Sequence, residues 1–342
     1  RPPIYTDDLS VWRGPDGSKL HVIMGSRSNR LVYFRRVTSE NDRSGFSSTP
    51  WNQGGVAILT LLAVVVSGLL ARRNLKLGRS DTRGALRFAV YYFAADIFLG
   101  VVVSHHVADP PTESELAANH LIYALARSLR VWLYYVGFEP YARRLWPDLL
   151  ITWSRVLSGR FRDPLVGRDL MVGALFAVVF ALAILAAGGS SMEDLNRATS
   201  VLNNMLVTHQ QALIIALYYM AILLFCRVLT RNTALAVGLF TVIATLTATM
   251  SLRENAADWS QWIVKPMFFA GLAILYVRFG LLSAVTGLFC HWLLCVAPHT
   301  ADFGAWYAIG SNFALATVLV VACYGFYTST LAHRQPSSAV MR

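Results

Sequence analysis

Long apolar runs, each close to the length that a helix needs to cross a bilayer, recur from Trp51 to near the end of this 342-residue chain. A bilayer core about 30 Å thick takes roughly 20 apolar helical residues. We expect nine spans, at residues 53–71, 87–104, 120–138, 169–188, 209–227, 233–250, 262–277, 280–297 and 306–328. The seventh and eighth are short and adjacent, so one long kinked segment is the alternative. The predicted fold class is an all-α membrane protein, a bundle of about nine transmembrane helices.

Composition agrees with this class, since 55% of the residues are hydrophobic and only 14% are charged. The net charge of +11 would suit a nucleic-acid partner only if the basic residues formed a solvated surface. They lie instead in short connectors between apolar runs. We therefore expect the lipid bilayer and its anionic headgroups as partners, and no nucleic acid.

The basic residues alternate from connector to connector, which predicts the orientation of the bundle. One set of connectors and the C-terminal tail carry Arg72, Arg73, Lys76, Arg79, Arg83, Arg87, Arg143, Arg144, Arg155, Arg160, Arg162, Arg168, Arg227, Arg231, Arg278, Arg334 and Arg342. The opposite connectors carry only Arg197 and Arg253, against the acids Asp109, Glu113, Glu115, Glu193, Asp194, Glu254, Asp258 and Asp302. Short basic loops stay in the cytoplasm. The N-terminal piece should lie outside and the C-terminus inside.

Residues 1–50 are polar and mixed, and two alternating stretches within them predict a β-hairpin. These are KLHVIMG at 19–25 and RLVYFRRV at 30–37, joined by SRSN. Two strands alone are marginal in water, so we expect the end of a larger β-containing extracytoplasmic region. The domain plan is this piece at 1–50, a polytopic bundle at 51–334 and a cytoplasmic tail at 335–342.

The connector EPYARRLWPDLLITWSRVLSGRFRDPLVGRD, at 139–169, contains an amphipathic stretch at about 146–162. Large apolar residues recur at helical spacing, and polar and basic residues occupy the other side. We expect an interfacial helix on the cytoplasmic side, with its aromatic side chains in the acyl boundary and its arginines toward anionic headgroups. The expected membrane-binding residues are Trp146, Trp153, Arg155, Arg160 and Arg162. This helix could be a topology determinant alone or a docking site.

Ionisable side chains within the predicted spans are expected to pair, because an unpaired charge at the bilayer centre costs at least about 2.5–3.5 kcal/mol on insertion scales. Asp96 lies near the middle of the second span and Arg130 at a comparable depth in the third. We predict that these two residues pair, or that Arg127 replaces Arg130 if the helix register differs. The pair could lock two helices together or belong to a proton or ligand path.

Several histidines gather near the predicted outer side, and His105, His106 and His120 flank one loop. Imidazoles at one level could bind a divalent metal. These residues lack a recognisable ligand spacing, so we expect neither a metal site nor a cofactor in this chain. The four cysteines fall within or beside apolar runs, where sulfur packs as a small hydrophobe.

Several motifs together resemble the C-terminal multi-pass region of bacterial membrane-bound serine/threonine protein kinases. They are RRNLKLGRSDTRGALR, SHHV at 104–107, EPYARRLWPDLLITWSRVLSGRFRDPLVGRDL, DFGAWYAIGS and YGFYTS. The N-terminal stretch from PPIYTDDLSVW to RLVYF is similar to the end of the soluble region that precedes those helices. The resemblance implies a bacterial inner-membrane protein whose cytoplasmic kinase domain precedes Arg1, so that this chain is a fragment.

The resemblance carries over a module and no catalytic residues. The Gly-rich phosphate loop, the strand lysine and the HRD loop, which position ATP and metal in kinases, do not occur in this chain. Asp302, Phe303 and Gly304 spell DFG, but they lie in a predicted outer loop with no HRD motif upstream. We therefore expect a noncatalytic anchoring and signal-sensing module.

Two other classes remain open on the sequence. A stand-alone transporter or channel is suggested by the ionisable residues within spans, although the paired interrupted helices that mark midplane substrate sites are not evident. An intramembrane enzyme would need a serine motif with a partner histidine, or an HExxH-type zinc motif. Neither motif occurs in the chain.

Overall fold

The computed structural model describes residues 7–13, 21–27, 30–37, 50–104, 109–186, 201–251, 259–296, 304 and 308–330. The chain divides into two compact units, Arg1–Ala57 and Ile58–Arg342. His105, His106 and most of the predicted outer connectors lie outside the described residues.

The N-terminal unit contains a three-stranded antiparallel sheet in the order β1-β2-β3, formed by β1 (Asp8–Arg13), β2 (His21–Arg27) and β3 (Arg30–Val37). The predicted hairpin is confirmed as β2 and β3, which pair from His21↔Val37 to Arg27↔Arg30 with an irregularity at Gly25/Ser26. The additional strand β1 pairs with β2 and was not predicted. Its sequence, DLSVWR, mixes polar and apolar residues too briefly to show a strand period.

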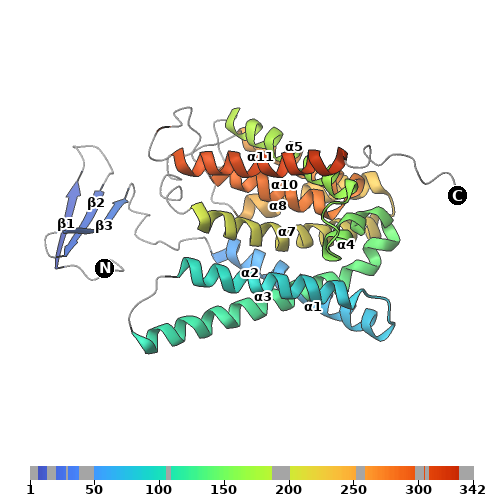
Figure 1. Ribbon diagram of the computed structural model, residues 1–342, viewed down its shortest axis with the longest axis horizontal. Helices are drawn as coiled ribbons and strands as arrows, with labels where there is room; N and C mark the ends of the chain where they lie inside the picture. Colours follow the sequence, from blue (N-terminus) through green and yellow to red (C-terminus); the bar gives the residue numbers. More distant parts are fainter. Residues whose placement is uncertain are drawn as a thin grey trace. The chain divides into compact units, whose positions relative to one another are not determined.

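The second unit is helical, and each apolar run predicted from the sequence overlaps one of the helices (Figure 1). The helices are α1 (Pro50–Lys76), α2 (Thr82–Val103), α3 (Pro110–Leu145), the short η2 (Pro147–Leu150) and α4 (Ile151–Leu157), α5 (Pro164–Ala186), α7 (Val201–Thr230), α8 (Thr233–Ser251), α9 (Trp259–Arg278), α10 (Leu281–Val296) and α11 (Ala308–Thr330). Among the described residues, four helices are long and apolar enough to cross a membrane: α2, α5, α7 and α11. The membrane-protein class agrees with these helices, and the count of nine crossings stays a prediction.

The seventh and eighth predicted segments are separate helices. Gly280, between α9 and α10, has a φ of +96°, which residues other than glycine rarely adopt. Its N–H donates to the carbonyl of Leu275, 2.9 Å away, and thereby ends α9. A Cβ at position 280 would also lie only 2.5 Å from the Leu149 carbonyl oxygen. The alternative of one long kinked helix is therefore wrong.

Small residues bring α5 close to its neighbours. A Cβ on Gly167 would lie 2.2 Å from Thr328 Oγ1 on α11, and one on Gly173 would lie 2.6 Å from the Ser283 carbonyl oxygen on α10. Helices in a membrane gain most of their association from such close van der Waals contact, because lipid tails are as apolar as leucine. These glycines place α5 against both α10 and α11.

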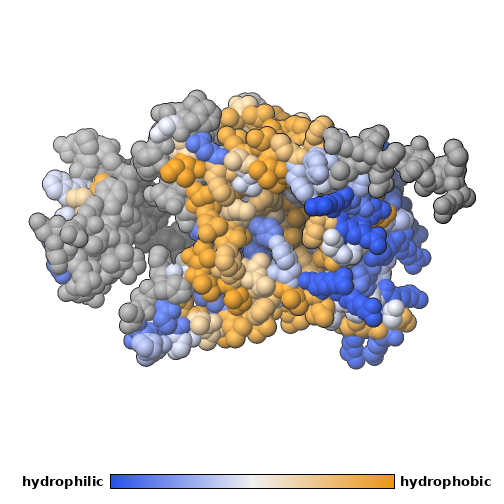
Figure 2. Space-filling model, viewed as in Figure 1, coloured by the Kyte–Doolittle hydropathy of each residue, from blue (hydrophilic) through white to orange (hydrophobic). Residues whose placement is uncertain are grey.

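The surface of the helical unit changes character along its length. Hydrophobic residues cover its middle, and hydrophilic residues gather at one end, on the right in Figure 2. Large apolar side chains of these helices, such as Leu69, Leu175, Phe225 and Val320, are each more than 60% exposed. A soluble protein rarely exposes a contiguous apolar surface of this extent, which agrees with a membrane protein.

Candidate functional site

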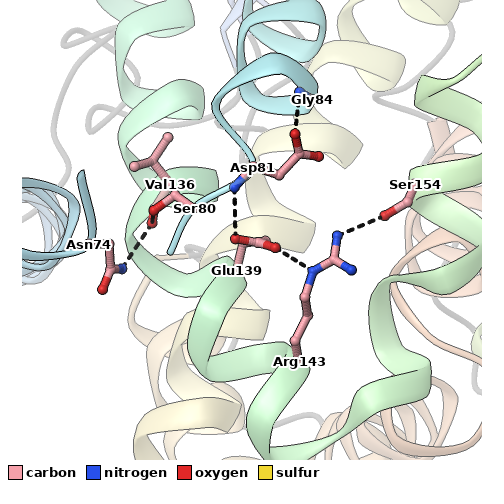
Figure 3. A network of polar contacts seen from close by, with 8 residues as sticks. All are labelled: Asn74, Ser80, Asp81, Gly84, Val136, Glu139, Arg143 and Ser154. Carbon is pink, nitrogen blue, oxygen red and sulfur yellow. Dashed lines mark hydrogen bonds and ion pairs between the residues drawn. The ribbon is translucent and has the colours of Figure 1, made fainter. Parts of the chain in front are cut away.

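One end of the helical unit carries the exposed residues Arg72, Arg79 and Arg144, and we call it the arginine-rich end. A buried carboxylate, Glu139 of α3, organises the polar contacts there (Figure 3). Glu139 is only 2% exposed. Its Oε2 accepts a hydrogen bond from the Asp81 backbone N–H at 3.2 Å, and its Oε1 pairs with Arg143 one helical turn away. A carboxylate this deeply buried requires such partners, since an unpaired buried charge is strongly unfavourable.

Pro140 explains why the neighbouring backbone of α3 takes hydrogen bonds from outside the helix. Proline has no N–H, so the carbonyl four residues earlier, that of Val136, lacks its usual partner within the helix. Asn74 of α1 donates its Nδ2 to the Val136 oxygen at 3.1 Å and to the Gly137 oxygen at 2.9 Å. The Ser80 hydroxyl also donates to the Val136 oxygen, at 3.3 Å. The proline thus creates an acceptor that binds α1 and the following turn to α3.

The same group of contacts reaches α2 and α4. Asp81 caps the start of α2, where its Oδ1 accepts the Gly84 N–H at 2.9 Å. Arg143 donates a second hydrogen bond, from Nη2 to Ser154 Oγ on α4, at 3.3 Å. We call the set Asn74, Ser80, Asp81, Glu139, Arg143 and Ser154 the Glu139 network. It connects the end of α1, the start of α2 and the last turns of α3 with α4.

The predicted interfacial helix is shorter than expected, and one of its faces points into the protein. Residues 147–157 form η2 and α4, whereas 158–163 are not helical. Trp153 is 5% exposed and packs edge-on against Phe88, with ring centroids 4.9 Å apart. The prediction that Trp153 lies in the acyl boundary is therefore wrong. An amphipathic pattern gives the apolar face of a helix but not whether that face meets lipid or protein.

The other four residues predicted to bind the membrane surface differ in how exposed they are. Trp146 is half-buried against the core, and Arg160 and Arg162 are exposed, as expected. Arg155 does not point freely outward, because its Nη1 contacts both carboxylate oxygens of Asp163 at 2.5 Å. Binding to headgroups thus stays a prediction for the two exposed arginines.

A second buried carboxylate, Asp169, lies near the start of α5 and was also missed from the sequence. It is fully buried, and its Oδ1 accepts hydrogen bonds from Arg168 Nε and Nη2 at 3.0 and 2.9 Å. Arg168 in turn lies over the Phe279 ring, 5.6 Å from its centroid. This pair fixes the start of α5 beside the end of α9.

The ion pair predicted within the spans forms in its alternative register. Asp96 Oδ1 accepts a hydrogen bond from Arg127 Nη1 at 2.9 Å, and Arg130 is not its partner. The Asp96 side chain is 4% exposed and that of Arg127 is 46% exposed. Arg130 Nε is buried without a hydrogen-bond partner in the part of the chain that the structure describes.

Of the three candidate histidines, His120 lies within the described residues, and its ring contacts a serine. His120 Nε2 lies 2.7 Å from Ser104 Oγ, and the Ser104 hydroxyl donates its proton to the Gly100 carbonyl. Ser104 therefore accepts from His120, the reverse of a serine that a general base activates. Within the described ranges, no three His, Cys, Asp or Glu side chains are grouped to hold a metal ion. His105 and His106 lie outside those ranges.

Nothing in the sequence alone singled out Asn74, Ser80 or Glu139. Two signals could have done so, namely the proline inside the apolar run directly after Glu139 and the asparagine among the arginines that end the first span. The network positions helix ends and offers no nucleophile with an oriented base. Comparison with protein-family models, curated proteins and solved structures finds no match to the chain.

Proposed function

We propose that this chain is a noncatalytic membrane module that anchors a serine/threonine protein kinase domain in the bacterial cytoplasmic membrane and carries signals to it. The observation that supports this most is the Glu139 network, which ties four helix ends together at the arginine-rich end. A cytoplasmic domain that contacts that end would respond to any movement of these helices. The resemblance of the connector motifs to bacterial membrane-bound kinases supplies the kind of domain.

The proposal places nine helices across the membrane, with the N-terminal unit outside and the C-terminus in the cytoplasm. It is supported by the exposed arginines at one end of the helical unit, including Arg72, Arg79, Arg144, Arg160 and Arg162. Basic residues next to membrane helices favour the cytoplasmic side. The lipid bilayer and its anionic headgroups would then surround α4 and its neighbours.

Cysteine labelling in intact cells tests the orientation. Glu115 and Arg160 are both exposed and lie at opposite ends of the helical unit, so E115C and R160C form a matched pair. A membrane-impermeant maleimide should label E115C from outside and reach R160C only after the membrane is opened. The exposed Cys323 is replaced by serine in both variants to remove background. Equal labelling of the two positions in intact cells would contradict the orientation.

The coding sequence directly upstream of Arg1 tests whether a kinase domain belongs to the same protein. We expect a Gly-rich loop, a strand lysine and an HRD catalytic loop, because phosphoryl transfer needs all three to position ATP and metal. An upstream region without these motifs would leave an anchor for some other domain, or a stand-alone membrane protein.

Anchoring and regulation are distinguishable in the full-length kinase. A ligand can regulate only if it binds two states of the bundle with different affinity. Asn74→Ala removes two hydrogen bonds between α1 and α3 at a distance from any kinase active site. If the bundle regulates, autophosphorylation in membranes should change in this variant. An unchanged rate, at equal protein amounts, would indicate an anchor alone.

A transporter or channel is the second candidate, and the Asp96–Arg127 pair is the observation that favours it. Ionisable residues within membrane helices often mark substrate or ion pathways. If the chain is a transporter or channel, the purified protein in proteoliposomes should show saturable solute uptake. Flux equal to that of empty liposomes, over a panel of amino acids, organic anions and monovalent cations, favours the anchoring module.

A further inference from the structure

Around Asp96, where α2 packs on α3, the positive side chains outnumber the negative ones. Asp96 is paired with Arg127, and Arg130 lies one turn further along α3 with no hydrogen bond or ion pair to any residue that the structure describes. Tyr92 lies one helical turn before Asp96 on α2, and Arg130 lies one turn after Arg127 on α3, so the four residues occupy adjacent turns of two helices joined by the Asp96–Arg127 pair. We call Tyr92, Asp96, Arg127 and Arg130 the Asp96 cluster. It carries one negative and two positive charges.

An uncompensated arginine within a membrane helix is costly, and its cost falls when an anion binds to it. Arg130 Nε is buried, so water does not reach it freely. Its neighbours on α3 and α2, Tyr134 and Tyr92, are each 2% exposed. The Tyr92 hydroxyl donates to the Gln210 carbonyl of α7 at 3.4 Å, which brings α7 to the same two helices.

A second residue in the same region also lacks partners. Gln210 is 4% exposed, and neither its Nε2 nor its Oε1 has a hydrogen-bond partner among the described residues. Buried side-chain amides are nearly always hydrogen-bonded in native proteins. Unused donors therefore occur on two helices, α3 and α7, that both lie against Tyr92.

The cluster is open toward the apolar outer surface of α2 and α3. Arg127 keeps 46% of its side chain exposed, and its guanidinium lies over the Tyr123 ring, 6.0 Å from the centroid. Large apolar side chains of the same two helices are also more than half exposed: Val90, Tyr91, Phe98, Tyr123, Leu125 and Leu129. An acyl chain could lie along this surface while its polar end reaches the arginines.

We propose that Arg127 and Arg130 bind the anionic group, a carboxylate or a phosphate, of an amphiphile that enters laterally from the bilayer. The excess positive charge selects an anion, and the exposed apolar surface of α2 and α3 selects an acyl chain. A guanidinium matches either oxyanion through parallel hydrogen bonds. This site rests on the membrane placement of α2 and α3 in the proposed function, and it would supply the ligand that distinguishes two states of the bundle.

The test uses the full chain purified in dodecyl maltoside. Binding of radiolabelled oleate and of phosphatidylglycerol is measured at equilibrium, with inorganic phosphate as a third probe, and thermal unfolding is followed with and without each probe. We expect saturable binding near one molecule per chain for one or both amphiphiles, and a higher unfolding temperature when it is bound. Tighter binding of oleate would identify a carboxylate ligand, and tighter binding of phosphatidylglycerol a lipid phosphate.

Arg130→Gln should weaken binding roughly tenfold or more, because it removes a charge-assisted contact. It should also abolish the ligand-induced rise in unfolding temperature without lowering the unfolding temperature of the free protein. Arg160→Gln removes an exposed arginine far from the cluster and should change neither quantity. Arg130→Lys keeps the charge and should retain part of the affinity.

Three results would overturn the site. These are binding to Arg130→Gln as tight as to the unaltered chain, no saturable amphiphile binding, and inorganic phosphate binding as tightly as the amphiphiles. Since binding is measured in detergent, it does not depend on which end faces the cytoplasm. Failure of the labelling experiment above would therefore leave the binding result interpretable, and the reverse also holds.

Discussion

The Glu139 network and the Asp96 cluster hold almost equally buried carboxylates, yet their surroundings differ. Glu139 and Asp96 have side chains 3% and 4% exposed, and their arginine partners are 48% and 46% exposed. Around Glu139, the donors of Asp81, Arg143 and Asn74 all have acceptors. Around Asp96, a second arginine has none. The two carboxylates are therefore equally buried, and the sites differ in the second arginine, which only the Asp96 cluster leaves without a partner among the described residues.

The two ion pairs also differ in whether their residues lie on one helix or on two. Glu139 and Arg143 lie on one helix, one turn apart, so the pair forms as soon as α3 does. Asp96 and Arg127 come from two helices and meet only when α2 packs on α3. The first pair can be expected to persist through movements of the bundle, and the second is suited to change with them.

The largest effect is expected from Arg143→Met, which leaves the Glu139 carboxylate buried without its cation. Removing one partner of a buried ion pair costs about 3–5 kcal/mol. The free energy of unfolding, measured by dodecyl sulfate titration in mixed micelles, should fall by that order. Arg144→Met is the matched control, since Arg144 is the exposed neighbour. Similar losses in both variants would remove the structural role given to the network.

Asp96→Asn should cost about 2–3 kcal/mol in the same titration, because it removes the charge-assisted hydrogen bond between Asp96 and Arg127. The double variant Asp96→Asn with Arg127→Gln should recover part of this loss. A double-mutant cycle then isolates the interaction between the two side chains. Equal losses in the single and double variants would contradict a stabilising pair.

Asn74→Ala should cost about 1–3 kcal/mol, because the Val136 carbonyl that Pro140 leaves free then loses its closest donor. Restoring the helix hydrogen bond tests the cause directly. In a Pro140→Ala background the new N–H can bond to the Val136 carbonyl, so the same asparagine change should cost less. Equal costs in the two backgrounds would show that Pro140 is not the reason for the contact.

The smallest effect is expected for Arg130→Gln without ligand. Arg130 has no partner among the described residues to lose, so the free energy of unfolding should stay within about 0.5 kcal/mol or rise slightly. This result would sharpen the difference between the two sites, because the arginine of the network and the arginine of the cluster would respond oppositely. A loss comparable to that of Arg143→Met would mean that Arg130 is structural.

Much of the helical fold was predictable from the sequence. Apolar runs of the right length located the helices, because burying the backbone in lipid or in a helical core requires continuous intrahelical hydrogen bonding. The hairpin of β2 and β3 followed from its alternation, whereas β1 was missed because DLSVWR is short and mixed. The boundary between α9 and α10 was ambiguous until the left-handed conformation of Gly280 was known.

The sites were less predictable. The sequence indicated that Asp96 would pair with an arginine of the third span, but not which one, because Arg127 and Arg130 lie on neighbouring positions of one helix turn. Similarly, it identified the apolar face that contains Trp153 but placed that face in lipid rather than against Phe88. Both errors concern which surface a helix presents to which neighbour.

By itself, the sequence determined that this chain forms long apolar helices with arginines gathered in alternate connectors, since helix length and charge placement are local properties of the chain. Only the tertiary structure decided that Asn74 and Asp81 meet α3 beside Pro140, and that Arg127 rather than Arg130 takes Asp96. Those contacts depend on the rotation and depth at which helices pack. Rotation and depth are set by residues on several helices, such as the glycines of α5 and the proline of α3.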